Sequence, residues 1–246
     1  MTKQVWNWSS LQRKSDSLMN KAYIKACERL ILRAFILNPK SFHILDIGSG
    51  SGLVLRHINA IAKNPFNYLG TDLNPEGLEI LKKRAKNLNI LDRVETLSAD
   101  CSIQNTDWKS KFDQVFSNFC LYTINDRQTR LSALKNIAYY LKPNGTFHIA
   151  LPSDNYGANK IAIQCLIDEL SDSQNLLLKF VRTIFLVPYQ WFFVLRPIEK
   201  RVNNGDFVRF SQNQIEAEFS AAGLEINEII IDYGGSGFHI HGKRAQ

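Results

Sequence analysis

The sequence predicts an α/β fold with a mostly parallel sheet, and two segments at a fixed spacing carry that prediction. The first is a short apolar run that contains an acid and leads into three alternating glycines, Ile44-Leu45-Asp46-Ile47-Gly48-Ser49-Gly50-Ser51-Gly52. Apolar runs of this length suit a strand that is buried on both faces. The second run, residues 66–72, ends in Asp72, 20 residues after Gly52. This spacing is typical of a strand–helix–strand unit in a parallel sheet.

The loop between these two strands has the residue types of a ligand site lined by backbone. Glycine adopts positive φ and lets a ligand approach the main chain without contacting a Cβ. A helix that begins near Gly52 would direct its free N–H groups toward an anionic part of the ligand. The carboxylate of Asp72 can accept hydrogen bonds from both hydroxyls of a ribose. A nicotinamide-binding loop would have its third glycine one residue later, where this chain has Leu53, so the sequence disfavours a dehydrogenase.

The other elements are predicted from apolar periodicity and from residues that begin or end helices. An apolar stripe predicts a helix over residues 15–37, which ends before Pro39 because the residue preceding a proline disfavours helix. Pro75 suits the first turn of a helix over 75–88, and Ser211 and Gly223 suit the two ends of a helix over 212–222. The remaining predicted elements are a helix at 127–141 and strands at 94–100, 112–118, 146–151, 224–232 and 238–243.

This order of motifs resembles the class I S-adenosylmethionine-dependent methyltransferases, and among them the small-molecule branch (methyltransferase type 11/12-like). The resemblance rests on Asp46-x-Gly48-x-Gly50-x-Gly52, on Asp72, on the strand that ends at Asp100, and on the turn Leu141-Lys142-Pro143-Asn144-Gly145. It implies a Rossmann-like, seven-stranded sheet, mostly parallel with an antiparallel last strand, with helices on both faces, an N-terminal helix and an insertion lid. The implied cofactor is S-adenosyl-L-methionine, and the cofactor-binding residues are expected to be Asp46, Gly48, Ser49, Gly50, Asp72, Leu73, Asp100, Cys101 and Asn118.

Residues 117–126, after the fourth expected strand, form the segment in which such enzymes usually contact the acceptor. The segment lacks the [DN]-P-P-[YF] signature of enzymes that methylate exocyclic amines, and it lacks the Pro-Cys pair of cytosine C5 enzymes because Phe119 precedes Cys120. Cys120 is therefore expected to be a small buried side chain and not a nucleophile. Tyr122 stands where the small-molecule branch often has a histidine, so it either contacts the substrate or packs the loop. No catalytic residue is assigned.

Residues 153–206 form an insertion that the family core does not require. Its first part, residues 159–170, is expected to be helical, and residues 176–195 are apolar and aromatic. Lys179, Arg182 and Pro188 argue against a transmembrane helix. Three interpretations remain: the aromatic residues pack the insertion onto the domain, they form a lid over an apolar substrate pocket, or they contact a membrane surface. Tyr189 and Trp191 are the candidate substrate-binding residues of this segment.

Composition indicates a single domain over residues 1–246, with the usual share of apolar and charged side chains. The four cysteines have no metal-ligand spacing, His239 and His241 lack a third ligand, and no metal site is predicted. His148, in the fifth expected strand, is either a core histidine or a base that faces the pocket. The N-terminus has no signal-peptide pattern, so a cytoplasmic location with free thiols is expected.

The net charge of +7 is spread along the chain. It indicates either a solvated surface or affinity for nucleic acid, anionic lipid or an acidic substrate. Nucleic acid is the less favoured partner, because no dense basic tract occurs and residues 183–195 contain no lysine or arginine.

The resemblance therefore implies methyl transfer from S-adenosylmethionine to the O, N or C atom of an acceptor, which the apolar insertion indicates is small and rather apolar. The alternatives are an RNA methyltransferase and a cofactor-binding protein without transfer activity. Trp6, Trp8 and Tyr23 precede the core and either close over the cofactor or pack against it. The oligomeric state is left open.

Overall fold

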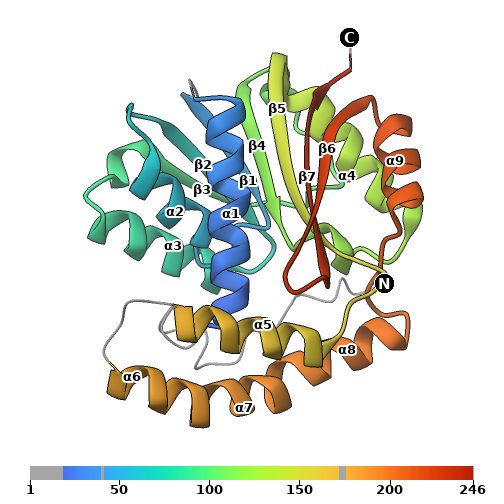
Figure 1. Cartoon of the computed structure of the whole chain (residues 1–246). Coiled ribbons are helices and arrows are strands. Elements are labelled where there is room, and N and C mark those ends of the chain that lie inside the picture. Colours follow the sequence, from blue (N-terminus) through green and yellow to red (C-terminus); the bar gives the residue numbers. More distant parts are fainter. Residues whose placement is uncertain (1–18, 40–41, 172–175, 246) are drawn as a thin grey trace.

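The computed structural model describes residues 19–39, 42–171 and 176–245, and its centre is a seven-stranded sheet in the order β3-β2-β1-β4-β5-β7-β6 (Figure 1). Neighbouring strands from β3 to β5 are parallel, whereas β7 runs antiparallel to both β5 and β6. This confirms the predicted Rossmann-like sheet with its antiparallel last strand. The strands are β1 (His43–Ile47), β2 (Asn67–Asp72), β3 (Val94–Ser98), β4 (Phe112–Asn118), β5 (Leu141–Pro152), β6 (Leu224–Asp232) and β7 (Gly237–Arg244).

Helices cover the sheet on both faces, because successive side chains of the central strands point to opposite sides. Ile44 of β1 and Phe116 of β4 belong to one apolar core, together with residues of helices α1 to α3. Leu45 and Val115, the adjacent residues, belong to a second core with residues of α4 and α9. The helices are α1 (Lys21–Leu37), which crosses one face of the sheet in Figure 1, α2 (Leu53–Ile61), α3 (Pro75–Asn87), α4 (Arg127–Tyr140) and α9 (Gln212–Ala221).

Capping residues determine where these helices begin. The Asn20 side chain accepts a hydrogen bond from the Tyr23 N–H at 3.2 Å, so α1 begins at Lys21. Residues 15–18 of the predicted helix lie outside the described part of the chain, as do Trp6 and Trp8. Ser211 caps α9 as predicted, with its hydroxyl oxygen 3.3 Å from the Gln214 nitrogen.

Two predicted strands differ from the structure by more than one residue at an end. β3 ends at Ser98, opposite Asp72, because its parallel partner β2 ends there, and Asp100 therefore lies in the following loop. β5 begins at Leu141, which pairs with Phe112 through an irregularity in the register, so the predicted turn before Thr146 belongs to the strand. Short 3₁₀ turns complete this part of the fold, η2 (Leu91–Arg93), η3 (Thr106–Trp108) and η4 (Leu121–Thr123).

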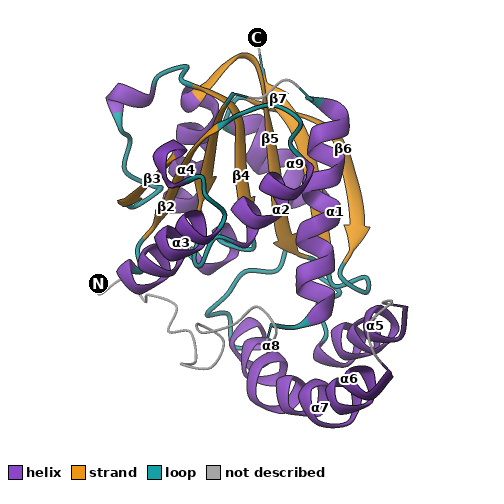
Figure 2. Ribbon diagram, turned by 90° about the vertical axis from the view of Figure 1, so that its left-hand side faces the viewer, coloured by secondary structure: helices purple, strands orange, loops and turns teal. Residues whose placement is uncertain are grey.

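The insertion after β5 is a pair of antiparallel helices that lies at the carboxyl ends of the parallel strands (Figures 1 and 2). Helix α5 (Ala158–Ser171) confirms the predicted helix. Residues 176–203 form one further helix in five consecutive parts, α6 (Leu176–Val181), the π-helical turn η5 (Arg182–Leu186), α7 (Val187–Gln190), the π-helical turn η6 (Trp191–Leu195) and α8 (Arg196–Asn203). A buried ion pair of 2.7 Å between Glu169 and Arg182 joins the two helices.

Candidate active site

The glycine loop after β1 lies directly against the loop after β4. Gly48 has a φ of +72°, and a Cβ at this position would lie 2.3 Å from the Cys120 Sγ. Its N–H donates to the Thr71 carbonyl at 2.8 Å, which ties the loop to the end of β2. Only glycine permits this approach, since any side chain here would force the two loops apart.

Asp72, at the end of β2, is held in position by two backbone groups. Its carboxylate accepts the N–H of Gly50 and the N–H of Asn74, each at 2.8 Å. Each carboxylate oxygen uses one acceptor position in these bonds and has a second. The arrangement fixes the orientation of Asp72 and leaves it able to accept two hydroxyl donors.

Asp46 lies behind the glycine loop and not in the cavity wall. Its side chain is fully buried, one oxygen accepts a hydrogen bond from the Tyr68 hydroxyl, and the other has no partner among the described residues. Burial raises the pKa of Asp46 from 3.8 to about 7. The structure thus places Asp46 beneath the loop and outside the cavity wall, and its direct contact with the cofactor stays a prediction.

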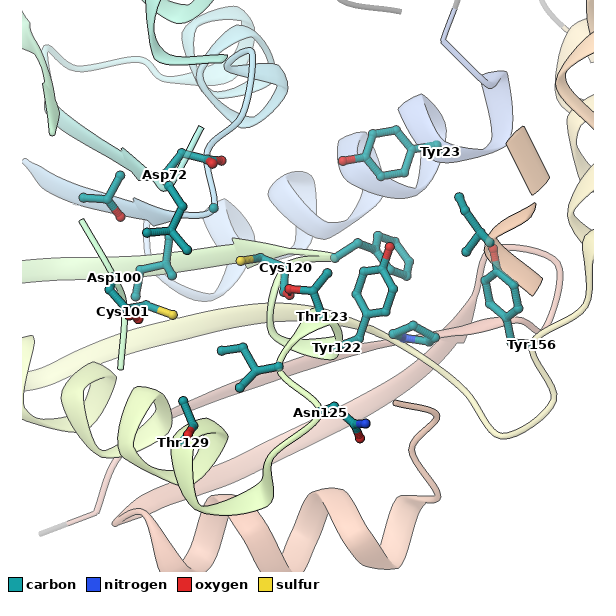
Figure 3. Close-up of a pocket in the computed structure, with 18 of the residues that line it drawn as sticks. Tyr23, Asp72, Asp100, Cys101, Cys120, Tyr122, Thr123, Asn125, Thr129 and Tyr156 are labelled. Carbon is teal, nitrogen blue, oxygen red and sulfur yellow. The ribbon is translucent and has the colours of Figure 1, made fainter. Parts of the chain in front are cut away.

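A cavity of about 450 Å³ opens at the carboxyl ends of the strands (Figure 3). At one end lie predicted cofactor residues, with Asp72, Asp100 and Cys101 on the same side of the view. The predicted residues in the wall are Gly48, Asp72, Leu73, Asp100, Cys101 and Tyr122. Ser49, Gly50 and Asn118 flank the wall without lining it. The Ser49 hydroxyl and the Asn118 Oδ1 are buried without a partner among the described residues.

Aromatic side chains form the other end of the cavity. Tyr23, Phe119, Tyr122, Tyr156 and Tyr233 line it, and the Phe119 ring lies 5.9 Å from Tyr23 and 5.2 Å from Tyr233 between centroids. Burial raises the pKa of Tyr156 and of Tyr233 well above the usual value, so both hydroxyls stay protonated. Three of these residues were missed in the sequence. Phe119, Tyr156 and Tyr233 follow the carboxyl ends of β4, β5 and β6. Their position after these strand ends, where ligands bind in parallel sheets, was the only feature of the sequence that could have predicted them.

The insertion reaches the cavity with aliphatic side chains, which corrects the expectation for Tyr189 and Trp191. Val194, Leu195 and Ile198 line the cavity, whereas neither aromatic residue does. The Trp191 Nε1 donates to the Asn159 side chain at 2.8 Å, and Tyr189 is exposed and stacks on Phe193. The cause is helical geometry, which turns Leu195 inward and Tyr189 outward.

No histidine lines the cavity among the described residues. His148 is a core histidine, because its Nδ1 lies 2.7 Å from that of His241 in β7 and burial lowers its pKa well below the usual value. Loss of hydration raises the pKa of the Cys120 thiol well above its usual value, so it is not a thiolate at neutral pH. The described residues contain no cluster of metal-binding side chains.

Comparison with known proteins agrees with this geometry. Residues 44–145 match the family model described as a methyltransferase domain. The non-reducing polyketide synthase ausA of Penicillium brasilianum is 27% identical over 112 residues, and the bifunctional methyltransferase of Rickettsia prowazekii is 27% identical over 134 residues. These matches cover 44% and 45% of this chain, but the chain spans only 4% and 25% of the length of those two relatives.

Solved structures share the fold over nearly the whole chain. The complex between the Haloferax volcanii Trm112 methyltransferase activator and a methyltransferase contains a chain with a TM-score of 0.64 and 18% identity, with coverage of 97% of this chain and 96% of that one. An S-adenosylmethionine-dependent methyltransferase from Clostridium acetobutylicum has a TM-score of 0.61 and 13% identity, with coverage of 96% and 95%. Residues 44–145 thus match a methyltransferase domain, and the chain shares the fold of a solved S-adenosylmethionine-dependent methyltransferase, in agreement with the predicted enzyme class and its cofactor, S-adenosylmethionine.

Within the described residues, no helix combines the length and the apolar character needed to cross a membrane.

Proposed function

We propose that this chain transfers the methyl group of S-adenosylmethionine to a small, rather apolar acceptor. The observation that carries the proposal is the shape of the site. A single cavity joins the Asp72 and Asp100 end to the aromatic end around Tyr156 and Tyr233. Such a cavity can place a polar cofactor and an apolar acceptor next to each other, which is the requirement for direct group transfer.

The residues at the first end fit the cofactor. Gly48 lines the cavity at this end, and Asp72 is oriented to accept two ribose hydroxyls. Leu73, Asp100 and Cys101 complete this end and would surround the adenine. When bound, S-adenosylmethionine supplies a methyl group on a sulfonium, which a nucleophile can displace directly.

The other end positions the acceptor and excludes water. Its wall combines tyrosine and phenylalanine rings with Val194, Leu195 and Ile198 of the insertion, so an apolar molecule would lose its hydration shell there. Asp126 is the carboxylate among the described wall residues at this end. It caps α4 by accepting hydrogen bonds from Thr129, and these bonds lower its pKa. The described residues of this wall include no histidine, so the site suits an acceptor that is nucleophilic without a strong protein base, such as a neutral amine or a stabilised carbanion.

The similarity to a polyketide synthase supports a small-molecule acceptor over RNA. The proposal is tested by incubating the protein with methyl-labelled cofactor and with lysate fractions enriched in RNA, protein, lipid or small metabolites. We expect label in the lipid or small-metabolite fraction. Label in RNA, or in the protein fraction alone, would contradict the proposal, and cofactor binding without transfer to any fraction would favour a binding protein.

A further inference from the structure

The helix over residues 176–203 has apolar side chains on both of its sides. Its inner side packs toward the rest of the molecule with residues such as Val187, Leu195 and Val202, which are buried. Its outer side carries a row of exposed residues at helical spacing, which we call the outer stripe: Val181, Ile184, Phe185, Pro188, Tyr189, Phe192 and Phe193. A helix between a protein core and water normally carries polar side chains on its outer side. This one does not.

The aromatic residues of the outer stripe are strongly exposed. The exposed fractions are 66% for Phe185, 56% for Phe192 and 60% for Phe193. Within the described part of the chain, Phe193 lies 4.9 Å from both Phe192 and Tyr189 between ring centroids, so these three rings contact one another. Contiguous exposed apolar surface of this kind marks a site of contact with a protein or a membrane. The neighbouring helix α5 adds further exposed apolar residues, Ile163, Ile167 and Leu170.

The charged residues between Asp172 and Glu199 are all basic, because no aspartate or glutamate occurs there. Exposed Arg196 and Lys200 follow the stripe on the same helix, and Lys179 precedes it. An apolar helix face with basic residues at its ends and no acids within it is complementary to a layer of anionic lipid headgroups.

We propose that the outer stripe binds the surface of an anionic lipid bilayer, with the helix lying in the plane of the interface. Its position permits this, because the helix forms the outermost layer of the molecule beyond the ends of the strands (Figures 1 and 2). The apolar rings would enter the boundary between headgroups and acyl chains, while Arg196 and Lys200 contact the phosphates.

The same helix forms part of the cavity wall on its inner side. Val194 and Ile198 line the cavity, and Phe193 next to them belongs to the outer stripe. Docking on a bilayer would therefore bring the apolar end of the cavity close to the acyl chains. The inference that the acceptor is a lipophilic molecule drawn from the membrane rests on the proposed function.

Vesicle co-sedimentation tests membrane binding without any methyl transfer. The full chain is mixed with phosphatidylcholine vesicles that contain phosphatidylglycerol, and with vesicles of phosphatidylcholine alone. The stripe variant carries Phe185→Ser and Phe193→Ser. Its matched control carries Ile36→Ser and Ile231→Ser, at residues that are 70% and 69% exposed elsewhere on the surface. We expect the wild type and the control to sediment with the anionic vesicles, and the stripe variant to bind about tenfold more weakly.

A second pair of variants tests the charges. Arg196→Gln with Lys200→Gln should weaken binding to anionic vesicles and make it less sensitive to salt, whereas Lys83→Gln with Lys135→Gln should change it little. Circular dichroism verifies that each variant is folded. Wild type that stays in the supernatant with anionic vesicles would overturn the proposal, as would a stripe variant that sediments like the wild type. A dimer in light scattering that the stripe substitutions dissociate, without vesicle binding, would assign the stripe to a second copy of this chain. Loss of methyl transfer with vesicle binding intact would contradict the proposed function and leave membrane binding standing.

Discussion

Phe119 and Tyr233 share a left-handed backbone conformation, and their tilted rings pack against each other in the cavity wall. Their φ angles are +49° and +58°, and their ring centroids are 5.2 Å apart. Bulky residues rarely adopt positive φ, and the conformation costs about 1–3 kcal/mol at each position. Both residues follow the carboxyl end of a strand, so the fold accepts backbone strain at the two points where a ring enters the cavity.

The substitution Phe119→Asn tests the backbone strain and the aromatic ring separately, because it removes both and the two losses affect different measurements. Asn tolerates positive φ, so relief of strain should offset most of the lost packing, and the free energy of unfolding should change by less than about 1.5 kcal/mol. The aromatic wall is lost, so the KM for the acceptor should rise at least about fivefold while cofactor affinity stays within about twofold. Urea unfolding and steady-state kinetics measure both quantities. An unchanged acceptor KM would show that Phe119 does not contact the acceptor.

Elements with a regular local pattern could be predicted from the sequence. β4 and β6 occur with their predicted bounds, because alternating and apolar runs between turn residues define them locally. The helix over 176–203 was not predicted, since its apolar residues face every direction and leave no amphipathic period. Trp191 was assigned to the pocket from its residue type and from the position of the insertion after the fifth strand, whereas the turn of this helix decides which side chains face inward.

The cofactor end of the site was more predictable than the acceptor end. Gly48 and Asp72 lie in one strand–helix–strand unit, so their spacing in the sequence already places them together. Tyr23, Tyr156 and Tyr233 come from segments far apart in the chain, and only the assembled fold brings them into one cavity wall. Figure 3 shows Tyr23 and Tyr156 there. No local pattern in the sequence marks such a group.

The substitution Ile198→Ala tests which side of the insertion helix contacts the acceptor. Ile198 lines the cavity, and removal of its side chain should raise the acceptor KM by about fivefold or more without changing cofactor affinity. Trp191→Phe is the matched control, because Trp191 lies outside the wall and its indole bonds to Asn159. A larger effect of Trp191→Phe than of Ile198→Ala would contradict the placement of the wall.

The Asp46→Asn variant should change the pH dependence of stability. Burial raises the pKa of Asp46 to about 7, so between about pH 4 and pH 7 the native carboxyl holds a proton that the unfolded chain has released. The protonated Asp46 therefore stabilises the wild type at low pH, and this stabilisation is lost as the pH rises from about 4 to about 7. The unfolding free energy of the wild type minus that of Asp46→Asn should fall by up to about 4 kcal/mol from pH 4 to pH 7. Chemical denaturation across this range measures it, and a difference that is constant with pH would contradict the raised pKa.

The buried ion pair of Arg130 and Glu218 should stabilise both the fold and the acceptor end of the cavity. The two nitrogens of Arg130 lie 2.7 and 2.8 Å from the Glu218 carboxylate, and a third donates to the Ile124 carbonyl at 2.7 Å. Glu218→Ala leaves the buried guanidinium without its partner and should lower the free energy of unfolding by about 3–5 kcal/mol. Arg127→Ala, at an exposed residue near the same carboxylate, should cost less than about 1 kcal/mol. Equal effects of the two substitutions in urea unfolding would contradict this account.

The central claim is that Asp72 holds the cofactor at the ends of β1 to β3, and calorimetric titration with S-adenosylmethionine tests it most directly. Asp72→Ala removes a charged acceptor of two hydroxyls, and each such bond contributes about 1.5–3 kcal/mol. We expect this variant to bind the cofactor at least about tenfold more weakly than the wild type, while Asp92→Ala, at an exposed aspartate outside the cavity, binds it equally. Thermal unfolding establishes that both variants are folded at the temperature of the titration. Unchanged affinity in a folded Asp72→Ala protein, or no binding of S-adenosylmethionine by the wild type, would contradict the claim.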